Sequence, residues 1–91
     1  MRAGIDNPAV VQALNAQGKN EEVIQWLDEH RAWMEDTEVE GGLTFWLAKS
    51  QADLGRYDGS ISSLEDFERR FAGDPYLYDA IRLRASVYRK M

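Results

Sequence analysis

The side chains that most often catalyse reactions or hold metal ions are sparse in this chain. Cysteine is absent, and His30 is the single histidine. A zinc site needs several ligands and a nucleophile needs a base beside it, so one histidine supplies neither. His30 also falls on or beside the apolar face of an expected helix, where packing or an interface is the favoured role.

Carboxylates and glycines do not form a catalytic pattern either. Acidic pairs occur at Glu21–Glu22, Asp28–Glu29 and Glu35–Asp36, but neighbours in a helix point in different directions and do not converge on one substrate. Gly41–Gly42 lacks the lysine and the preceding strand of a phosphate-binding loop. We therefore expect that the protein is not an enzyme and uses no metal or cofactor.

The charge is unevenly distributed along the chain. Residues 1–40 hold nine acids and three bases, whereas residues 41–91 hold seven acids and eight bases. The net charge of −5 disfavours nucleic acid as a partner. A small nucleic-acid-binding helical domain stays a weaker alternative, and it would use the basic residues near the C-terminus: Arg82, Arg84, Arg89 and Lys90.

The length of 91 residues predicts one small domain, and a hydrophobic content of 44% is enough for a packed core. No apolar run approaches the roughly 20 residues that cross a bilayer, so we expect no membrane span. The first residues show no apolar signal segment. The compartment stays open. The absence of a signal segment favours the cytoplasm, and the periplasm is the alternative if this is a mature or excised domain.

Apolar residues recur at helical spacing on both sides of Gly55, which suits the left-handed end of a helix. Before Gly55 come Leu43, Trp46, Leu47 and Leu54; after it come Tyr57, Ile61, Leu64, Phe67 and Phe71. So short a connection leaves only an antiparallel helical hairpin.

This stretch resembles a tetratricopeptide repeat. The matching segments are Trp46-Leu47-Ala48, Leu54-Gly55-Arg56-Tyr57-Asp58, Ile61, Leu64 and Asp74-Pro75. Two features depart from the family: Ser60 stands where alanine is usual, and the second helix is about one turn longer than the ~34-residue repeat allows. The longer form, ending in residues 69–76, is similar to bacterial cell-envelope members of the family.

An internal repeat supports the same interpretation. Gly18 and Gly55 are 37 residues apart. The same residue types follow both glycines: Ile24 and Ile61 six residues later, and Leu27 and Leu64 nine residues later. Self-similarity at a fixed period is the sequence signature of stacked helical repeats.

The first hairpin has its own boundary signals. Asn7–Pro8 predicts a helix start, Gly18 a helix end, and Asn20 the cap of the second helix. The apolar stripe of that second helix comprises Val23, Ile24, Leu27, His30 and Met34, with Trp26 and Trp33 beside it. We expect at least one of these two tryptophans in the core, and Trp33 is a candidate interface residue.

The second hairpin begins after an acidic connector. Thr37 and Glu40 have the spacing of a capping box, which predicts a third helix from near Glu38 to Leu54. Gly41–Gly42 would then lie in its first turns. They provide either a loose entry or a place where a neighbouring helix approaches closely, and both alternatives stay open.

The predicted fold is all-α, with antiparallel helical hairpins stacked as a short tetratricopeptide-like solenoid. One domain spans residues 1–91 and contains about five helices, or two and a half repeats. The first hairpin covers residues 7–36, the second covers residues 38–73, and a terminal helix covers residues 75–91.

The resemblance implies a protein-protein interaction module, because such solenoids bind a peptide or partner protein on a concave surface lined by the first helix of each repeat. The implied groove positions are Gln12, Asn15, Ala16, Phe45, Lys49, Ala52, Asp53, Arg82, Ser86, Arg89 and Lys90. The basic residues at the C-terminal end suit an extended peptide with an acidic end.

The terminal helix is also expected to self-associate. Such arrays generally need about three repeats for stability. We therefore expect its apolar face to be covered in part by Leu64 and Phe67, and in part by a second chain in a homodimer. That face comprises Ile81, Leu83, Val87 and Tyr88. The alternative is a structural piece of a longer scaffold or envelope assembly factor, whose further repeats complete the fold.

Overall fold

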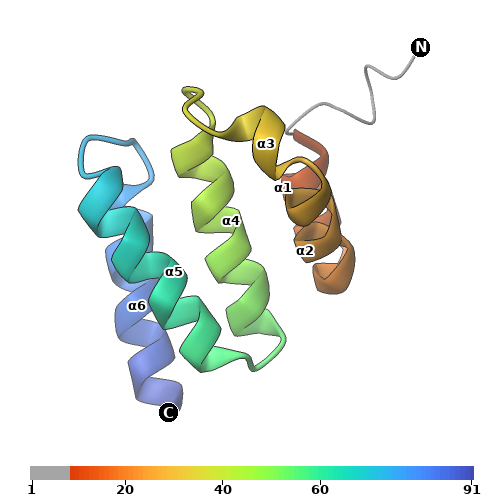
Figure 1. Cartoon of the computed structure of the whole chain (residues 1–91). Coiled ribbons are helices and arrows are strands. Elements are labelled where there is room, and N and C mark those ends of the chain that lie inside the picture. Colours follow the sequence, from red (N-terminus) through yellow and green to blue (C-terminus); the bar gives the residue numbers. More distant parts are fainter. Residues whose placement is uncertain (1–8) are drawn as a thin grey trace.

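The computed structural model describes residues 9–91, and every regular element in this range is a helix. The helices are α1 (Ala9–Ala16), α2 (Asn20–Glu29), α3 (Arg31–Met34), α4 (Glu40–Asp53), α5 (Tyr57–Arg70) and α6 (Leu77–Lys90). Adjacent long helices pack antiparallel (Figure 1). The all-α prediction is confirmed for these residues. The predicted helix start at Asn7–Pro8 lies outside them.

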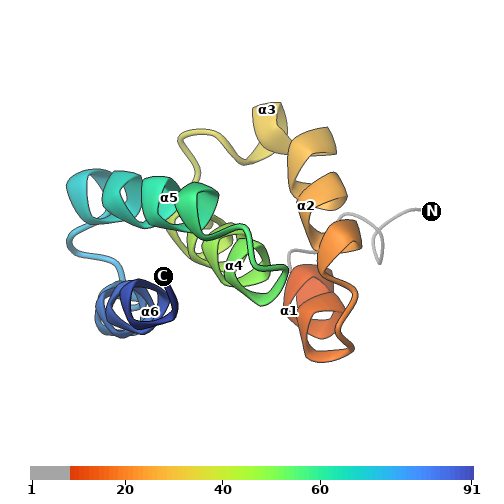
Figure 2. The same cartoon turned by 90° about the horizontal axis from the view of Figure 1, so that it is seen from below.

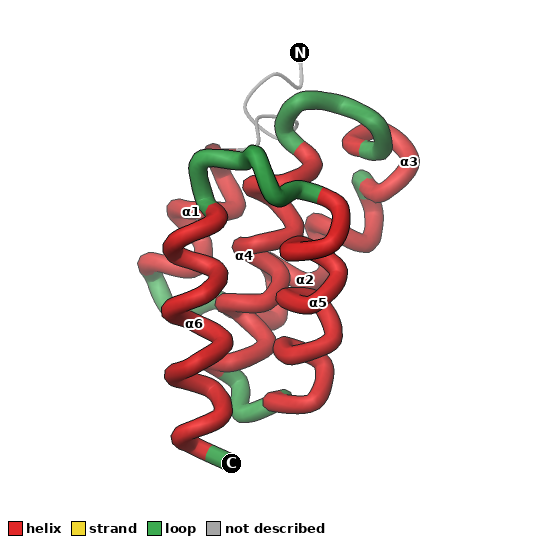
Figure 3. Tube along the Cα trace, turned by 90° about the vertical axis from the view of Figure 1, so that its left-hand side faces the viewer, coloured by secondary structure: helices red, strands yellow, loops and turns green. Residues whose placement is uncertain are grey.

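The helices form two layers. Figure 2 shows α1, α4 and α6 in one layer and α2, α3 and α5 in the other. Helix α4 packs against α1 and α2 on one side and against α5 and α6 on the other. Figure 3 shows α6 lying alongside α5, in agreement with their contacts. None of the described helices is long and apolar enough to cross a membrane.

Two apolar clusters meet at α4. The first contains Val11, Val23, Trp26, Leu27, Met34 and Leu43. The second contains Phe45, Ala48, Leu64, Phe67 and Ala80. Trp46 packs against both clusters, so α4 joins the two hairpins into one core.

The corners at Gly18 and Gly55 have the same backbone geometry. Both glycines have φ of 77°, in the left-handed region where a side chain is disfavoured. Lys19 N donates to Leu14 O at 2.9 Å, and Arg56 N, 37 residues later, donates to Gln51 O at 2.8 Å. Each glycine N–H also donates to the carbonyl three residues before it, at 3.0 Å. Each corner is therefore a Schellman turn, which ends one helix and reverses the chain.

The prediction of five helices was wrong, because the expected second helix breaks at His30. There the backbone has φ −107° and ψ 11°. The imidazole stacks on Trp26, with ring centroids 3.9 Å apart, and His30 Nδ1 lies 2.8 Å from Trp26 O. The His30 side chain thus contacts the same Trp26 carbonyl that accepts from the His30 backbone N–H at the end of α2. The chain then continues as the single helical turn α3.

The predicted helix caps were also wrong. Lys19, not Asn20, is the residue before α2, and the Asn20 side chain instead accepts a hydrogen bond from Asn15 Nδ2 at 2.8 Å. Helix α4 begins at Glu40, without a capping box. Thr37 Oγ1 donates to Met34 O at 2.6 Å, and Glu40 Oε1 accepts from Asp36 N at 3.0 Å. Each of these side chains binds the backbone of the preceding turn, whereas in a capping box each would bind the backbone N–H of the other residue.

The structure decides between the two alternatives for Gly41–Gly42. A Cβ on Gly41 would lie 2.3 Å from Asp74 Oδ2, and one on Gly42 would lie 3.1 Å from Tyr76 Cε2. Both distances are shorter than ordinary contacts. The glycines therefore allow the loop between α5 and α6 to approach the start of α4 closely.

Candidate functional site

The concave surface of the α1, α4 and α6 layer is the candidate site. Figure 2 shows α4 set back between α1 and α6. Gln12, Lys49 and Ser86 are spaced 37 residues apart, one on each helix. Because the corners after α1 and α4 have the same geometry, Gln12 and Lys49 occupy equivalent places on their helices. Gln12 is exposed, and Lys49 and Ser86 are partly exposed.

Polar groove residues of α1 and α4 bind one another. Asn15 Nδ2 lies 3.1 Å from Ser50 Oγ and 3.2 Å from Asp53 Oδ2. Lys49 Nζ forms an ion pair with the same Asp53 oxygen at 2.8 Å. The structure therefore brings together three of the predicted site residues, in a network that also connects the two helices.

Phe45 is a correction to the predicted groove. It is only 7% exposed and stacks on Tyr76, with ring centroids 4.9 Å apart. Its neighbour Trp46 is partly exposed and lines a hollow. The line along α4 is therefore Gly42, Trp46, Lys49 and Asp53, at helical spacing. Helical spacing does not choose between Phe45 and Trp46, because they lie four and three residues before Lys49 and both spacings fall on one face. The family resemblance directed the prediction to Phe45.

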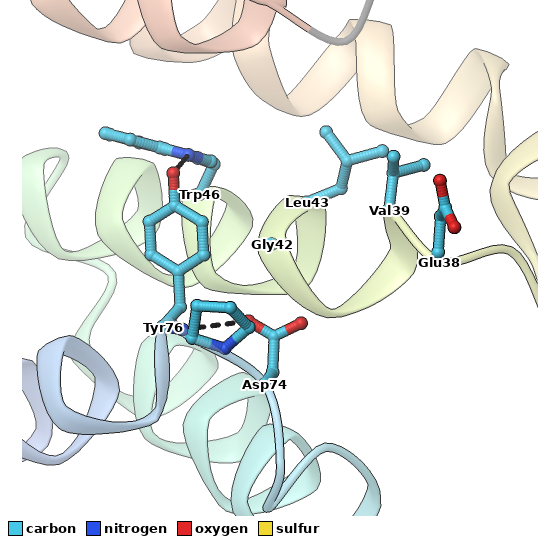
Figure 4. A pocket seen from close by; sticks show the side chains of 8 residues that line it. Glu38, Val39, Gly42, Leu43, Trp46, Asp74 and Tyr76 are labelled. Atoms are coloured by element: carbon cyan, nitrogen blue, oxygen red, sulfur yellow. Dashed lines mark hydrogen bonds between the residues drawn. The ribbon is translucent and has the colours of Figure 1, made fainter.

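The hollow lies where α4 begins and the α5–α6 loop crosses it, with a volume of about 290 Å³ (Figure 4). It is lined by Glu38, Val39, Gly42, Leu43, Trp46, Asp74, Pro75 and Tyr76. Trp46 Nε1 donates to the Tyr76 hydroxyl at 3.3 Å, and the two rings are inclined at 76°. Asp74 Oδ1 accepts from Tyr76 N at 2.9 Å, which fixes the turn within the loop.

Helix α6 carries the basic residues that the resemblance placed in the groove. Arg82, Arg89 and Lys90 are exposed, and their place in the groove stays a prediction. Arg82 pairs with Asp79 at 2.7 Å within α6. Arg84 Nε donates to Glu68 Oε2 on α5 at 2.5 Å, and this hydrogen bond raises the pKa of Arg84 above its ordinary value. Arg84 therefore binds α6 to α5.

The predicted self-association face divides into two. Val87 is 1% exposed, and Leu83 is partly buried against the cluster that contains Leu64 and Phe67. Leu83 therefore makes the predicted contact with this cluster, and Val87 is buried within the chain. Ile81 and Tyr88 remain exposed at 39% and 48%. They share the outer side of α6 with Tyr78, Ala85 and Met91, which are also exposed.

A second hollow lies between α2–α3 and α5 on the other layer. Ion pairs occupy its rim. Arg70 bridges the buried Glu40 carboxylate at 2.8 Å and Asp66 at 3.0 Å. Hydrogen bonds to these two acids raise the pKa of Arg70 above its ordinary value. These charges already have partners within the chain, so the concave face is the better candidate for binding.

The aromatic cluster around His30 has a packing role. Trp26 is buried, and Trp33 lies edge-on to both Trp26 and His30, with centroids 6.3 Å away in each case. The expectation that at least one of the two tryptophans is in the core is confirmed. Trp33 is exposed, and its interface role stays a prediction.

Neither a metal-binding group in the described part of the chain nor a known relative indicates a function. Within residues 9–91, no group of three or more His, Asp or Glu side chains is placed to hold a metal ion. Comparison with protein-family models, curated proteins and solved structures finds no match. The geometry of the concave face is therefore the basis for a functional proposal.

Proposed function

We propose that the protein is a non-catalytic interaction module of the tetratricopeptide type. Its concave face, formed by α1, α4 and α6, binds an extended peptide or partner protein. The observation that carries this proposal is the pair of matching Schellman turns at Gly18 and Gly55, 37 residues apart. Matching joints of this kind are what a stack of repeated helical hairpins requires.

Packing relations between the helices support the same proposal. Helix α4 contacts both helices of the hairpin before it, α1 and α2. Helix α6 likewise contacts both α4 and α5. In a regular stack, the first helix of each hairpin contacts both helices of the hairpin before it. The first helices of successive hairpins then lie side by side on one face.

The groove offers both kinds of contact that peptide recognition uses. One end has an apolar hollow of about 290 Å³, near the lower limit of ligand pockets and suited to one or two side chains. The other end carries Arg89 and Lys90, for which no ion pair is present among the described residues. An extended peptide between them would be anchored by an apolar contact and by charge-assisted hydrogen bonds.

Peptides selected from a random displayed library provide the direct test. We expect their binding to shift the amide NMR signals of α1, α4 and α6, and Arg89→Glu to weaken peptides with an acidic end about threefold to tenfold. Arg69→Glu, which reverses an exposed charge on α5, is the matched control and should leave affinity unchanged. Signals that shift only along α2, α3 and α5 would contradict the proposed groove.

We further propose that the exposed side of α6 forms a weak homodimer. Ala85 lies near the middle of this side, with Ile81 four residues before it and Tyr88 three residues after it. In an antiparallel pair of α6 helices, Ala85 would allow close approach while Ile81 of one copy meets Tyr88 of the other. Tyr78 and Met91 would pair in the same way at the two ends.

The side of α4 that corresponds to the exposed side of α6 is already packed against an antiparallel helix, α5. Positions 37 residues before Ile81, Ala85 and Tyr88 are Thr44, Ala48 and Gln51. Helix α5 contacts two of them: Ser60 Oγ donates to Ala48 O at 2.8 Å, and Ser63 Oγ donates to Gln51 Oε1 at 2.8 Å. The outer side of α6 has no such partner among residues 9–91.

Ala85→Glu tests the dimer without disturbing the monomer, because Ala85 is exposed. One pair of helices gives a small interface compared with the roughly 1,200 Å² of stable complexes, so we expect association only at high concentration. Light scattering should show the mass rising above 10.4 kDa for the native chain and for Ser62→Glu on α5, but not for Ala85→Glu. A native mass of 10.4 kDa at every concentration would refute the dimer.

A further inference from the structure

The charged residues that line the concave hollow are all acids. Glu38 and Asp74 contribute carboxylates, and no lysine or arginine lines the hollow. Neither carboxylate forms an ion pair within residues 9–91, whereas Glu40, next to the hollow in sequence, is paired with Arg70. The groove is therefore polarised, because its basic residues Arg89 and Lys90 lie at the far end of α6 (Figure 1).

Helix dipoles oppose this negative charge but do not cancel it. Helices α4 and α6 both begin near the hollow. Each helix N-terminus is equivalent to about half a positive charge. Two carboxylates carry about twice the charge of the two helix ends together, so the hollow keeps a net negative charge. A ligand group that is buried here is favoured if it is positive.

The walls suit a side chain with an apolar stem. Leu43 and Val39 lie on one side of the hollow and the Tyr76 ring on the other, with Gly42 between them (Figure 4). The Tyr76 hydroxyl accepts from Trp46 Nε1, and no acceptor for its own hydrogen is present among the described residues. That hydrogen is available to a carbonyl of a bound peptide.

We propose that the hollow binds an arginine or lysine side chain of the partner peptide. The stem packs between Leu43 and Tyr76, the head group binds the Glu38 and Asp74 carboxylates, and the aromatic rings add a cation–π contribution. This inference rests on the proposed function and adds a direction to it. The basic residue of the peptide lies where α4 begins, and its acidic end lies toward Arg89 and Lys90.

Two dipeptides of nearly the same shape, one charged and one neutral, test the proposal. The probes are acetyl-Leu-Arg-amide and acetyl-Leu-citrulline-amide, in which a neutral urea replaces the guanidinium. Each is titrated into the full chain while the NMR signals of the Trp46 indole and of the Gly42 and Tyr76 amides are followed. We expect the arginine peptide to shift these three signals, and the citrulline peptide to bind about twofold to fivefold more weakly.

Matched variants separate charge from structure. Glu38→Gln and Asp74→Asn each remove one charge and keep the shape, and the asparagine side chain retains an oxygen that can accept from Tyr76 N. Each should reduce the preference for arginine about twofold or more, whereas Glu22→Gln, an exposed acid on α2, should leave it unchanged. Raising the salt concentration should also reduce the preference.

The outcomes distinguish this inference from the proposed function. Equal binding of the two dipeptides at the hollow would overturn the charge preference and leave a peptide groove in place. An arginine preference that Glu38→Gln and Asp74→Asn do not change would also overturn it. If neither dipeptide shifts the three signals, the hollow is not an arginine site, and the displayed-library experiment decides the groove separately.

Discussion

Phe67→Ala is expected to lower the free energy of unfolding by about 3–5 kcal/mol. Phe67 is fully buried, at 0% exposure, between α4, α5 and α6. Truncation removes the apolar contacts of the ring and leaves a cavity that the surrounding helices fill only partly. Because domains of this size are commonly stable by only about 5–15 kcal/mol, the variant should lie close to unfolding at room temperature.

Urea denaturation followed by circular dichroism measures this effect. Tyr78→Ala is the control, because Tyr78 is an aromatic residue that is 76% exposed, and it should change stability by less than about 0.5 kcal/mol. If Phe67→Ala does not fold at all, Phe67→Leu, which keeps most of the volume, gives a smaller loss that is still measurable. Equal stability of Phe67→Ala and Tyr78→Ala would contradict the packing of the second cluster.

Gly18→Ala and Gly55→Ala are each expected to destabilise the protein by about 1–2 kcal/mol. Both glycines have φ of 77°, and a Cβ at either position would meet nothing within 4 Å. The cost is therefore the backbone conformation alone, and it should be the same at both corners. Because the sites are distant, the double variant should lose about 2–4 kcal/mol, close to the sum.

Gly73→Ala is the matched control for the corner glycines. Gly73 lies in the loop before α6, has no positive φ, and has open space where a Cβ would be placed. Alanine there should be neutral or slightly stabilising, since it restricts the unfolded chain. Chemical denaturation of the four variants gives the comparison. Unequal losses at Gly18 and Gly55, or a loss at Gly73 of the same size, would contradict two equivalent joints.

Local sequence patterns determined the long helices and the two matching turns at Gly18 and Gly55. Apolar spacing of three and four residues identifies a helix, because it collects apolar side chains on one face. A glycine at the end of such a stripe identifies a left-handed turn, because other residues resist that conformation. These signals lie within a few residues of one another, so Gly18, Gly55 and the antiparallel hairpins could be predicted without any tertiary information.

Tertiary contacts decided how α4 is rotated about its axis. Phe45 and Trp46 are both large and aromatic, and only packing against Tyr76, about 30 residues later, determined that Phe45 is buried and Trp46 lines the hollow. The helix break at His30 has local contacts instead, because the imidazole stacks on Trp26, four residues earlier, and lies edge-on to Trp33, three residues later. The choice between Phe45 and Trp46 is not visible in apolar spacing, because both residues are compatible with one face of a helix.

The candidate binding site is therefore mostly a product of the tertiary structure. Gly41–Gly42 could be read as a loose helix entry until Asp74 and Tyr76 were found against them. The sequence alone placed Lys49 and Asp53 on one face of a helix, since they are four residues apart. It did not place Glu38 and Asp74 at the same hollow, because residues so far apart are brought together only by the path of the folded chain.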